Sequence, residues 1–599
     1  MTTKVEFDTI TTTETTATTV FTNFTVNEFI SKIQFSWIDY TLFSTMLALS
    51  ALIGIYFGFF GKKQDTTEEY LLGGKTMKVF PVSMSLIASH ISGLTLLALP
   101  ADVYRYGAAY WHTCICIAIT AAIAAYVFLP VYYKLQLTST YEYLKLRFDN
   151  RMRTITSLLF AINTFLYNPV VIYIPALAFS QATGVHVHLI TPIVCSICIF
   201  YTTIGGLKAV VWSDTLQFIC TSGAMVSVFI LGLKASGGFA NVWQTSLDGQ
   251  RLDIFDFDID PTKRDGFWAL TFGQIVHWTA IIAINQGCVQ RFLAVPTISD
   301  AKKALGIFGV GMCIVKSLSV LTGLIIYTKY HNCDPLATKA VERSDQLLPY
   351  YVMDVAHHIP GLSGLFIAGI FSAALSTLSA TLNTVAGTIY EDFVAPRMSE
   401  KTTEKTASNI IKVIVVISGV VCTALVFVFE NLGGLLPLTI SIAGITAGPM
   451  LGLFILGMLF PSANSKGAYW GGMVGLVGTS IIILTAQYYK MMKILTFPPK
   501  PLSTDGCPHL VNATLSSWTS DPVVHQQPFA IFRITHYYYA FIGTAITVIV
   551  GLIVSYLTKR PTDPPVNRDY ISPVVHFALP KEKPSDYYSV EKAMEMVSQ

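Results

Sequence analysis

Long apolar runs separated by short polar segments are the dominant pattern along this chain. Each run is close to the roughly 20 helical residues that cross a hydrocarbon layer of ~30 Å. The runs do not alternate apolar and polar residues, as the strands of a membrane barrel would. The pattern therefore predicts an all-α membrane protein with about 13 transmembrane helices, at 37–60, 81–104, 111–133, 154–181, 189–204, 215–233, 268–286, 305–327, 361–386, 410–429, 435–459, 467–488 and 539–557.

These runs divide the chain into three parts. Residues 1–36 form an N-terminal segment, residues 37–558 form the transmembrane domain, and residues 559–599 form a tail. The tail contains six prolines and no apolar period. We expect it to be disordered.

Charged loops predict the orientation of the chain. Lysine and arginine cluster in the loops after the first, third and last predicted helices. Because such loops resist translocation, we expect the N-terminus outside and the C-terminus in the cytoplasm of a plasma-membrane protein. The glycosylation sequons at Asn23 and Asn512 then lie outside. Cys333 and Cys507 also lie outside, where a disulfide between them is possible.

Composition narrows the functional classes. Of 599 residues, 52% are hydrophobic and only 13% are charged, and the formal net charge is +3. This charge is too small and too dispersed for a nucleic-acid surface. The sequence has no HExxH motif, GxSxG elbow or clustered Cys/His ligand set. We expect a transporter, not an enzyme, with no organic cofactor.

The second predicted helix is interrupted by small and polar residues at 88–93 (ASHISG). Such a stretch favours a locally unwound helix, which frees backbone carbonyls near the middle of the membrane. Freed carbonyls are suitable ligands for a hard cation such as sodium. Close helix packing against small residues is the alternative interpretation.

The ninth predicted helix is dense in hydroxyl groups at 371–383 (FSAALSTLSATLN). Ser376 and Thr377 are adjacent and can both reach one ion, whereas Ser372, Ser379 and Asn383 share a face with Ser376. Serine and threonine also hydrogen-bond to their own helix backbone. The hydroxyl pattern alone therefore leaves ion binding and backbone bonding open.

Five stretches, in this order, resemble the sodium:solute symporter family, which includes sodium/glucose, monocarboxylate, multivitamin and iodide transporters. They are 88–91 with YRYG at 104–107; YTTIGGLKAVVWSDTLQ at 201–217; Asn285-Gln286 with VQR at 289–291; 371–383; and GLFILGMLFP at 452–461. The resemblance covers nearly the whole chain. It is greatest to the monocarboxylate, multivitamin and iodide branch.

The resemblance implies a leucine-transporter-type core of two inverted five-helix repeats with broken helices, at about 81–233 and 268–459. It implies sodium as the coupling ion and a functional monomer. The sodium site would combine the carbonyls of Ala88, Ile91 and Ala373 with the hydroxyls of Ser376 and Thr377. This set matches the two stretches already singled out.

Two charged residues lie within apolar runs. The resemblance implies that Asp214 takes part in cation passage, and a charge favoured by a helix N-terminus is the alternative. Lys316 lies near the middle of an apolar helix, where a charge costs roughly 2.5 to 3.5 kcal/mol. Our hypothesis is that Lys316 attracts an anionic solute or replaces a cation. A structural ion pair or snorkelling to a hydrated cavity is the alternative.

Specific substitutions restrict the solute. Sugar carriers have a Tyr-Trp pair where this chain has Ile281-Ile282, and a glutamine where it has Ser441. A sugar is therefore disfavoured, and a monocarboxylate or vitamin-like organic anion is the expected solute of a sodium-coupled importer. The alternatives are iodide, choline or a polyol, or a sodium-dependent sensor or channel-like protein. The expected solute contacts are Ser92, Thr95, Tyr167, Tyr173, His277, Lys316 and Ser441; His90 is a further intramembrane histidine.

Overall fold

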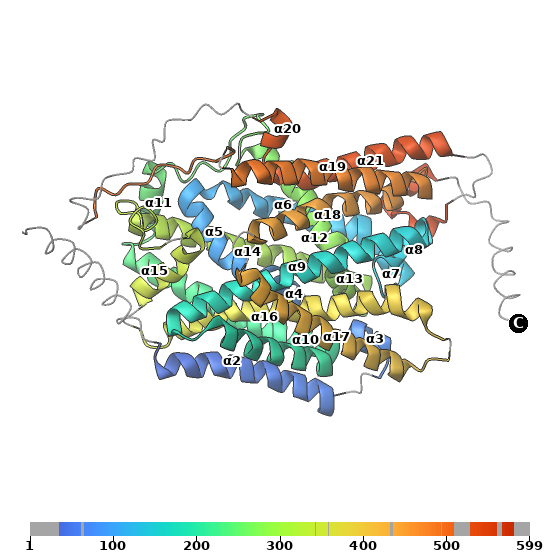
Figure 1. Cartoon of the computed structure of the whole chain (residues 1–599), viewed down its shortest axis with the longest axis horizontal. Coiled ribbons are helices and arrows are strands. Elements are labelled where there is room, and N and C mark those ends of the chain that lie inside the picture. Colours follow the sequence, from blue (N-terminus) through green and yellow to red (C-terminus); the bar gives the residue numbers. More distant parts are fainter. Residues whose placement is uncertain are drawn as a thin grey trace, which may run out of the picture.

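A computed structural model describes residues 35–61, 65–341, 343–356, 359–399, 401–431, 435–492, 494–507, 528–559 and 566–579. In this part of the chain, helices lie side by side along the long axis of the molecule (Figure 1). The predicted glycosylation residues Asn23 and Asn512 lie outside these ranges.

The long helices follow the apolar runs of the sequence. Nine helices of the described chain are long and apolar enough to cross a membrane, and a bent helix pair makes up to ten. The count of about 13 stays a prediction. The principal helices are α2 (Trp37–Ile55), α4 (Val79–His90), α5 (Gly93–Tyr106), α6 (Thr113–Ile123), α9 (Asn150–Thr183), α10 (Val187–Ala235), α12 (Gln274–Ala283), α13 (Gln286–Leu293), α14 (Ile298–Tyr330), α16 (Leu362–Ile389), α17 (Glu404–Asn431), α18 (Leu435–Leu459), α19 (Ser465–Met491) and α21 (Tyr539–Thr558).

The helix α10 folds back on itself as two halves. Its 49 residues would extend about 74 Å if straight, but Gly206 interrupts it with non-helical angles (φ 50°, ψ −153°). On the two sides of this glycine, Gln217 donates to Ser50 of α2 at 3.2 Å, and Tyr201 packs against Gly54, one turn further along α2. The halves therefore run back past each other, as expected for separate helices at 189–204 and 215–233.

Two breaks interrupt helices at corresponding places in the chain. The axes of α4 and α5 differ by 55° across a break at residues 91–92. α12 and α13 are separated at Ile284 and Asn285, and the Asn285 side chain caps α13 by accepting from Gly287 N. Each break opens one of the two expected five-helix repeats. The sequence predicts the first break but not the second.

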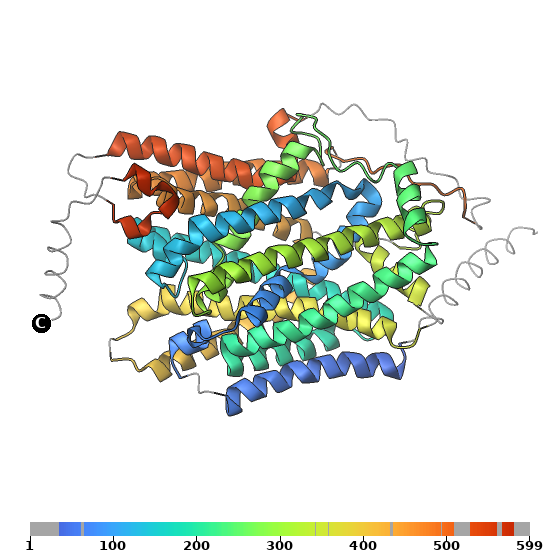
Figure 2. The same ribbon diagram turned by 180° about the vertical axis from the view of Figure 1, so that it is seen from behind.

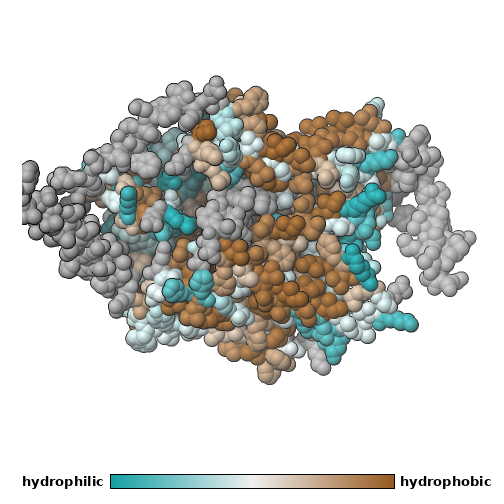
Figure 3. Space-filling model, viewed as in Figure 1, coloured by the Kyte–Doolittle hydropathy of each residue, from teal (hydrophilic) through white to brown (hydrophobic). Residues whose placement is uncertain are grey.

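Apolar residues cover the middle of the helices, and hydrophilic residues gather toward their ends (Figure 3). Many large apolar side chains on the outer faces are exposed, such as Ile417 (58%) on α17 and Val310 (64%) on α14. Such exposure is unfavourable in water and favourable in lipid. The chain is a multi-pass membrane protein.

Part of the tail is folded, which corrects the expectation of disorder from residue 559 onward. Residues 566–579 form two short 3-10 helices, Arg568–Tyr570 and Pro573–Ala578. Lys134 pairs with Asp569, the Tyr143 hydroxyl donates to Tyr570 O at 2.9 Å, and Ile571 is 1% exposed. The apolar residues between the prolines pack against the helices, although the prolines favour disorder.

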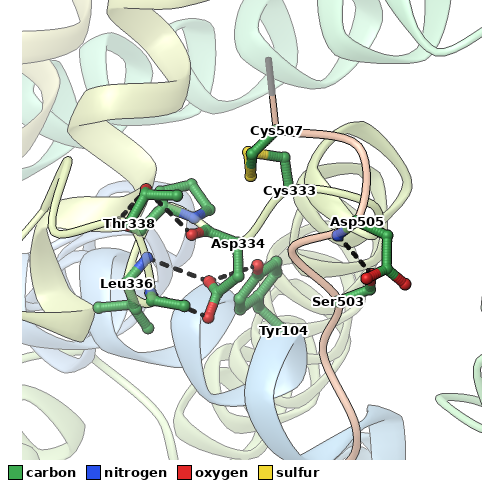
Figure 4. Close-up of a disulfide and its surroundings, with 10 residues drawn as sticks. Tyr104, Cys333, Asp334, Leu336, Thr338, Ser503, Asp505 and Cys507 are labelled. Atoms are coloured by element: carbon green, nitrogen blue, oxygen red, sulfur yellow. Dashed lines mark hydrogen bonds between the residues drawn. A yellow bond between two sulfur atoms is a disulfide. The ribbon is translucent and has the colours of Figure 1, made fainter. Parts of the chain in front are cut away.

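A disulfide joins Cys333, after α14, to Cys507 (Figure 4). The segment 494–507, which we call the strap, then crosses the end of α5. Its Lys500 N donates to Arg105 O at 2.8 Å, and its Ser503 O accepts from Asp334 N at 3.0 Å. The same Asp334 accepts from the Tyr104 hydroxyl of α5 at 2.8 Å. The disulfide thus anchors a segment that contacts both α5 and the end of α14.

Replacing either cysteine of this pair by serine is expected to lower the free energy of unfolding by about 2 to 5 kcal/mol, because the bond closes a loop of 174 residues in the unfolded chain. Thermal unfolding of the purified protein measures the loss. The double variant Cys333→Ser/Cys507→Ser should be no less stable than either single variant. A reductant should destabilise the native protein by the same amount and leave the variants unchanged; additive losses would contradict the pairing.

Candidate functional site

The first break and α16 bring four oxygen atoms together in the interior. The Ser376 hydroxyl of α16 lies 3.0 Å from Ala88 O and 3.0 Å from Ala373 O. The Thr377 hydroxyl lies 3.0 Å from Ala373 O and 3.4 Å from Ser89 O. Ser376 is fully buried and Thr377 is 5% exposed. We call the two hydroxyls with the carbonyls of Ala88 and Ala373 the oxygen cradle.

The local conformation explains why α4 ends at the cradle. Ile91 has extended angles (φ −103°, ψ 93°), so its carbonyl leaves the helical hydrogen-bond pattern. Ser92 then caps α5 by accepting from Thr95 N. Hydroxyl and carbonyl oxygens from two helices, without a carboxylate among them, form a donor set that suits a hard monovalent cation. The structure brings four of the five expected sodium ligands together, and Ile91 lies at the break beside them.

Asp214 lies beside the cradle in a buried polar network. Its carboxylate accepts from Ser85 at 2.6 Å and from Ser379 at 3.2 Å, and it pairs with Arg291 of α13 at 3.2 Å. The side chains of Asp214 and Arg291 are 0% and 3% exposed. Ser89 links the oxygen cradle to this ion pair, because its carbonyl faces Thr377 and its hydroxyl lies 3.1 Å from Arg291.

The position of Asp214 disfavours the alternative of a charge held by a helix N-terminus. It lies eight residues beyond Gly206, where the second half of α10 begins, and the effect of the dipole is confined to the first turn. The ion pair with Arg291 neutralises its charge instead. Arg291 belongs to one of the family-like stretches, but the sequence does not predict its partner, since 77 residues separate it from Asp214.

Lys316 is buried among aromatic rings. It is 4% exposed, which disfavours the alternative of snorkelling to a hydrated cavity. Its Nζ lies 5.5 Å from the Tyr110 ring and 5.7 Å from the Trp278 ring, distances at which a cation interacts with an aromatic face. Among the described residues, no carboxylate lies within salt-bridge distance of Lys316. The alternative of a structural ion pair is therefore disfavoured.

The two intramembrane histidines lie near the same rings. His90, at the end of α4, lies 6.3 Å from Trp278 between ring centroids, and its Nδ1 contacts Leu86 O at 2.7 Å. His277 precedes Trp278 on α12, and their ring centroids are 6.4 Å apart. Lys316 and His277 thus belong to one polar and aromatic cluster, which adjoins the cradle through His90.

The other expected solute contacts lie on three different helices. Ser92 and Thr95 lie together at the start of α5, with their hydroxyls 3.2 Å apart. Tyr167 and Tyr173 lie on α9, where both are partly buried. Ser441 belongs to α18, but its side chain lies outside the described residues. The structure therefore groups Ser92 with Thr95 and with Tyr167, whose side chain hydrogen-bonds to Ser92, and it groups Lys316 with His277.

The model of the sodium:solute symporter family matches residues 70–475, more than half of the chain. The chain belongs to the sodium:solute symporter family. This symporter is 38% identical to sodium-coupled monocarboxylate transporter 1 of Xenopus laevis, over 89% of this chain and 87% of that protein. It is 37% identical to sodium-coupled monocarboxylate transporter 2 of Homo sapiens, over 90% and 86%. A putative sodium-dependent multivitamin transporter of Drosophila melanogaster is 34% identical, over 87% and 86%.

A solved structure supports the fold of this symporter. A Na⁺-coupled sialic acid symporter in a substrate-bound outward-open state matches with a TM-score of 0.73 over 89% of this chain and 100% of that one, at 24% identity. The expected family and the leucine-transporter-type fold are confirmed, and the protein is a sodium-coupled symporter that binds sodium and a small solute.

Sequence reasoning missed three parts of the site. It assigned no role to Ser85 or to Trp278, and it did not foresee that Gln286 of α13 accepts from the Thr140 hydroxyl at 2.6 Å. The quoted motifs contained Gln286 and Arg291, but not their partners. The polar character of both residues in a buried segment was the available signal.

Proposed function

We propose that this symporter imports a small monocarboxylate or vitamin-like organic anion together with sodium. The observation that carries the proposal is the buried charge of Lys316 between two aromatic rings, with no carboxylate of the described residues paired to it. A buried cation is costly without an anion, and a carboxylate supplies that anion. The relatives named for monocarboxylate and multivitamin transport support the same class of solute.

Sodium binds in the oxygen cradle, with Ala88, Ala373, Ser376 and Thr377 as ligands and the carbonyl of Ile91 completing the set. Because α4 and α16 each contribute oxygen atoms, the bound ion holds the broken helix against α16. Release of the ion frees this contact and allows α4 to move away. Sodium thus stabilises the state in which the solute site is complete.

Asp214 assists the cation without binding the solute. Its carboxylate is linked to the cradle through Ser89 and Ser379. When sodium leaves toward the cytoplasm, the negative charge attracts it along this route, and Arg291 limits how tightly it is held. Asp214 is therefore a residue of the cation pathway.

The solute contacts lie on both sides of the first break. Lys316 and His277 bind the carboxylate, whereas Ser92, Thr95, Tyr167, Tyr173 and Ser441 surround the rest of the solute. Sodium entry releases about 2.3 kcal/mol per 100 mV of membrane potential and about 1.4 kcal/mol per tenfold concentration ratio. A monovalent anion consumes the electrical part of one sodium ion. Accumulation driven by the potential therefore needs more than one sodium ion per solute.

The protein acts as a monomer in the plasma membrane, with its N-terminus outside and its C-terminus in the cytoplasm. Cysteines 333 and 507 are joined, as an oxidising exterior favours. The folded part of the tail packs at the opposite end of the molecule from the strap (Figure 1). Asn23 and Asn512 are then exposed to glycosylation.

Uptake into proteoliposomes tests this function. With an inward sodium gradient, labelled short-chain carboxylates should accumulate at least about tenfold, the ratio that about 1.4 kcal/mol supports, whereas potassium in place of sodium should abolish accumulation. Glucose and choline are the control solutes. Accumulation of these in place of carboxylates would refute the solute class, and solute binding without accumulation would identify a sensor.

A further inference from the structure

The helix α14 lies between α6 and α10 (Figure 2). Side chains of these three helices line a groove of about 960 Å³. This volume is near the upper end of the range of ligand pockets, about 300 to 1,000 Å³. Alanines of α6 and of the following π-helical turn Ala124–Phe128 form one wall, and Val226, Phe229 and Ile230 of α10 form the other. The groove is distinct from the cradle and from the cluster around Lys316.

The lining of the groove includes a glycine, Gly306, that makes no close contact. A Cβ added at Gly306 would meet no atom within 4 Å, whereas one added at Gly311 on the same helix would lie 2.3 Å from Ile87. Glycine inside a helix costs about 1 kcal/mol relative to alanine, and in membrane helices close packing usually compensates for this cost. Close packing does not explain Gly306. The glycine instead keeps the groove open.

The groove has the length and surroundings of an acyl-chain site. On α14 its lining extends from Lys302 to Leu321, which corresponds to about 28 Å of helix and nearly the full ~30 Å of the hydrocarbon layer. Val310 and Ile314 line it and are 64% and 63% exposed. The groove therefore faces the hydrocarbon chains of the membrane.

A cation lies at one end of the groove. The Nζ of Lys302 lies 4.6 Å from the centroid of the Tyr126 ring, and both residues line the groove. The neighbouring Lys303 pairs with Asp300 at 3.2 Å, but no ion pair of Lys302 occurs within the described ranges. In the proposed orientation this end faces the cytoplasm. An anionic group is the complementary partner for this end.

We propose that the groove is a binding site for an anionic phospholipid of the cytoplasmic leaflet. The headgroup contacts Lys302 beside Tyr126, and one acyl chain lies along α14 over Gly306 and Val310. This leaflet is the one that carries anionic lipids and a negative surface potential. The assignment of the Lys302 end to the cytoplasmic leaflet rests on the orientation given under the proposed function. The groove and its positive charge do not depend on that orientation.

A lipid in this groove is coupled to the solute site through α14. Ser317 lines the groove and accepts from Trp111 Nε1 at 2.9 Å. Trp111 is adjacent to Tyr110, whose ring faces Lys316, the residue next to Ser317. An occupied groove therefore supports the packing of α14 beside the ring cluster around Lys316, and we expect the lipid to increase uptake.

Native mass spectrometry of the full-length protein, extracted from vesicles of equal phosphatidylserine and phosphatidylcholine, tests the site. The native protein should retain phosphatidylserine preferentially. Gly306→Leu places a side chain in the path of the proposed acyl chain and should lose the bound lipid. Lys302→Ala should keep a bound lipid, but its preference for phosphatidylserine over phosphatidylcholine should be about fivefold lower, as about 1 kcal/mol per lysine near an anionic surface implies.

Matched variants control for general effects. Gly223→Leu adds the same side chain to α10 at another position with no atom within 4 Å, outside the groove, and Lys303→Ala removes a cation next to Lys302. Both should retain the lipid as the native protein does. Equal retention by Gly306→Leu, or equal retention of both lipids by the native protein, would overturn the proposal. Sodium-driven uptake, measured separately, would still test the proposed function.

Discussion

Replacing both Ser376 and Thr377 by alanine is expected to abolish sodium-dependent uptake. The two hydroxyls are half of the four oxygens of the cradle, and alanine removes them without filling the space of an ion. Loss of a ligand to a charged group costs about 1.5 to 3 kcal/mol. Each single variant should therefore raise the half-saturating sodium concentration about tenfold or more, and the double variant should show no sodium dependence in proteoliposome uptake.

Ser372→Ala is the matched control for these variants. Ser372 lies one turn earlier on α16 and is as fully buried as Ser376, both at 0% exposure, so its replacement reports on the general cost of removing a buried hydroxyl. Its sodium dependence should stay that of the native protein. Thr377→Ser keeps the hydroxyl and should retain coupling. A normal sodium response in the double alanine variant would exclude the cradle as the sodium site.

The sequence predicts the helices well because membrane spans have a strong, local signature. A run of about 20 apolar residues is almost sufficient evidence for a span, and the expected helices at 189–204 and 215–233 appear as the two halves of α10. The structure of the tail was harder to predict. Its prolines suggested disorder, but Ile571 is buried and Ser572 N donates to Met458 O at 2.9 Å, contacts that no local pattern encodes.

The cradle was predictable because it is made by polar and small residues within helices that are otherwise apolar. A polar break in one helix and adjacent hydroxyls in another each indicate a site, and the resemblance connected the two stretches. Distant pairings were not predictable in the same way. The Asp214 and Arg291 pair and the rings around Lys316 depend on how helices far apart in the chain pack, so the sequence identified the charges but not their neighbours.

Conservative exchange of Lys316 distinguishes a charge requirement from a packing requirement. Lys316→Arg keeps a cation and should preserve part of carboxylate uptake, although its planar group has a different shape. Lys303→Met, on the exposed face of the same helix, should have no effect on uptake. Equal uptake of an acid and its neutral amide by the native protein would show that the charge of the solute is not recognised.

Lys316→Met is expected to change stability and uptake in opposite directions. Methionine has nearly the same length but no charge, so it relieves a burial cost of roughly 2.5 to 3.5 kcal/mol, and thermal unfolding of the purified variant should occur at a higher temperature. Truncating one partner of a buried charge pair costs about 2 to 5 kcal/mol in binding, so carboxylate uptake should fall at least about thirtyfold. A purely structural lysine would lose stability on replacement and leave the uptake per folded molecule unchanged. The opposed pair of results therefore separates a residue retained for the solute from one retained for the fold.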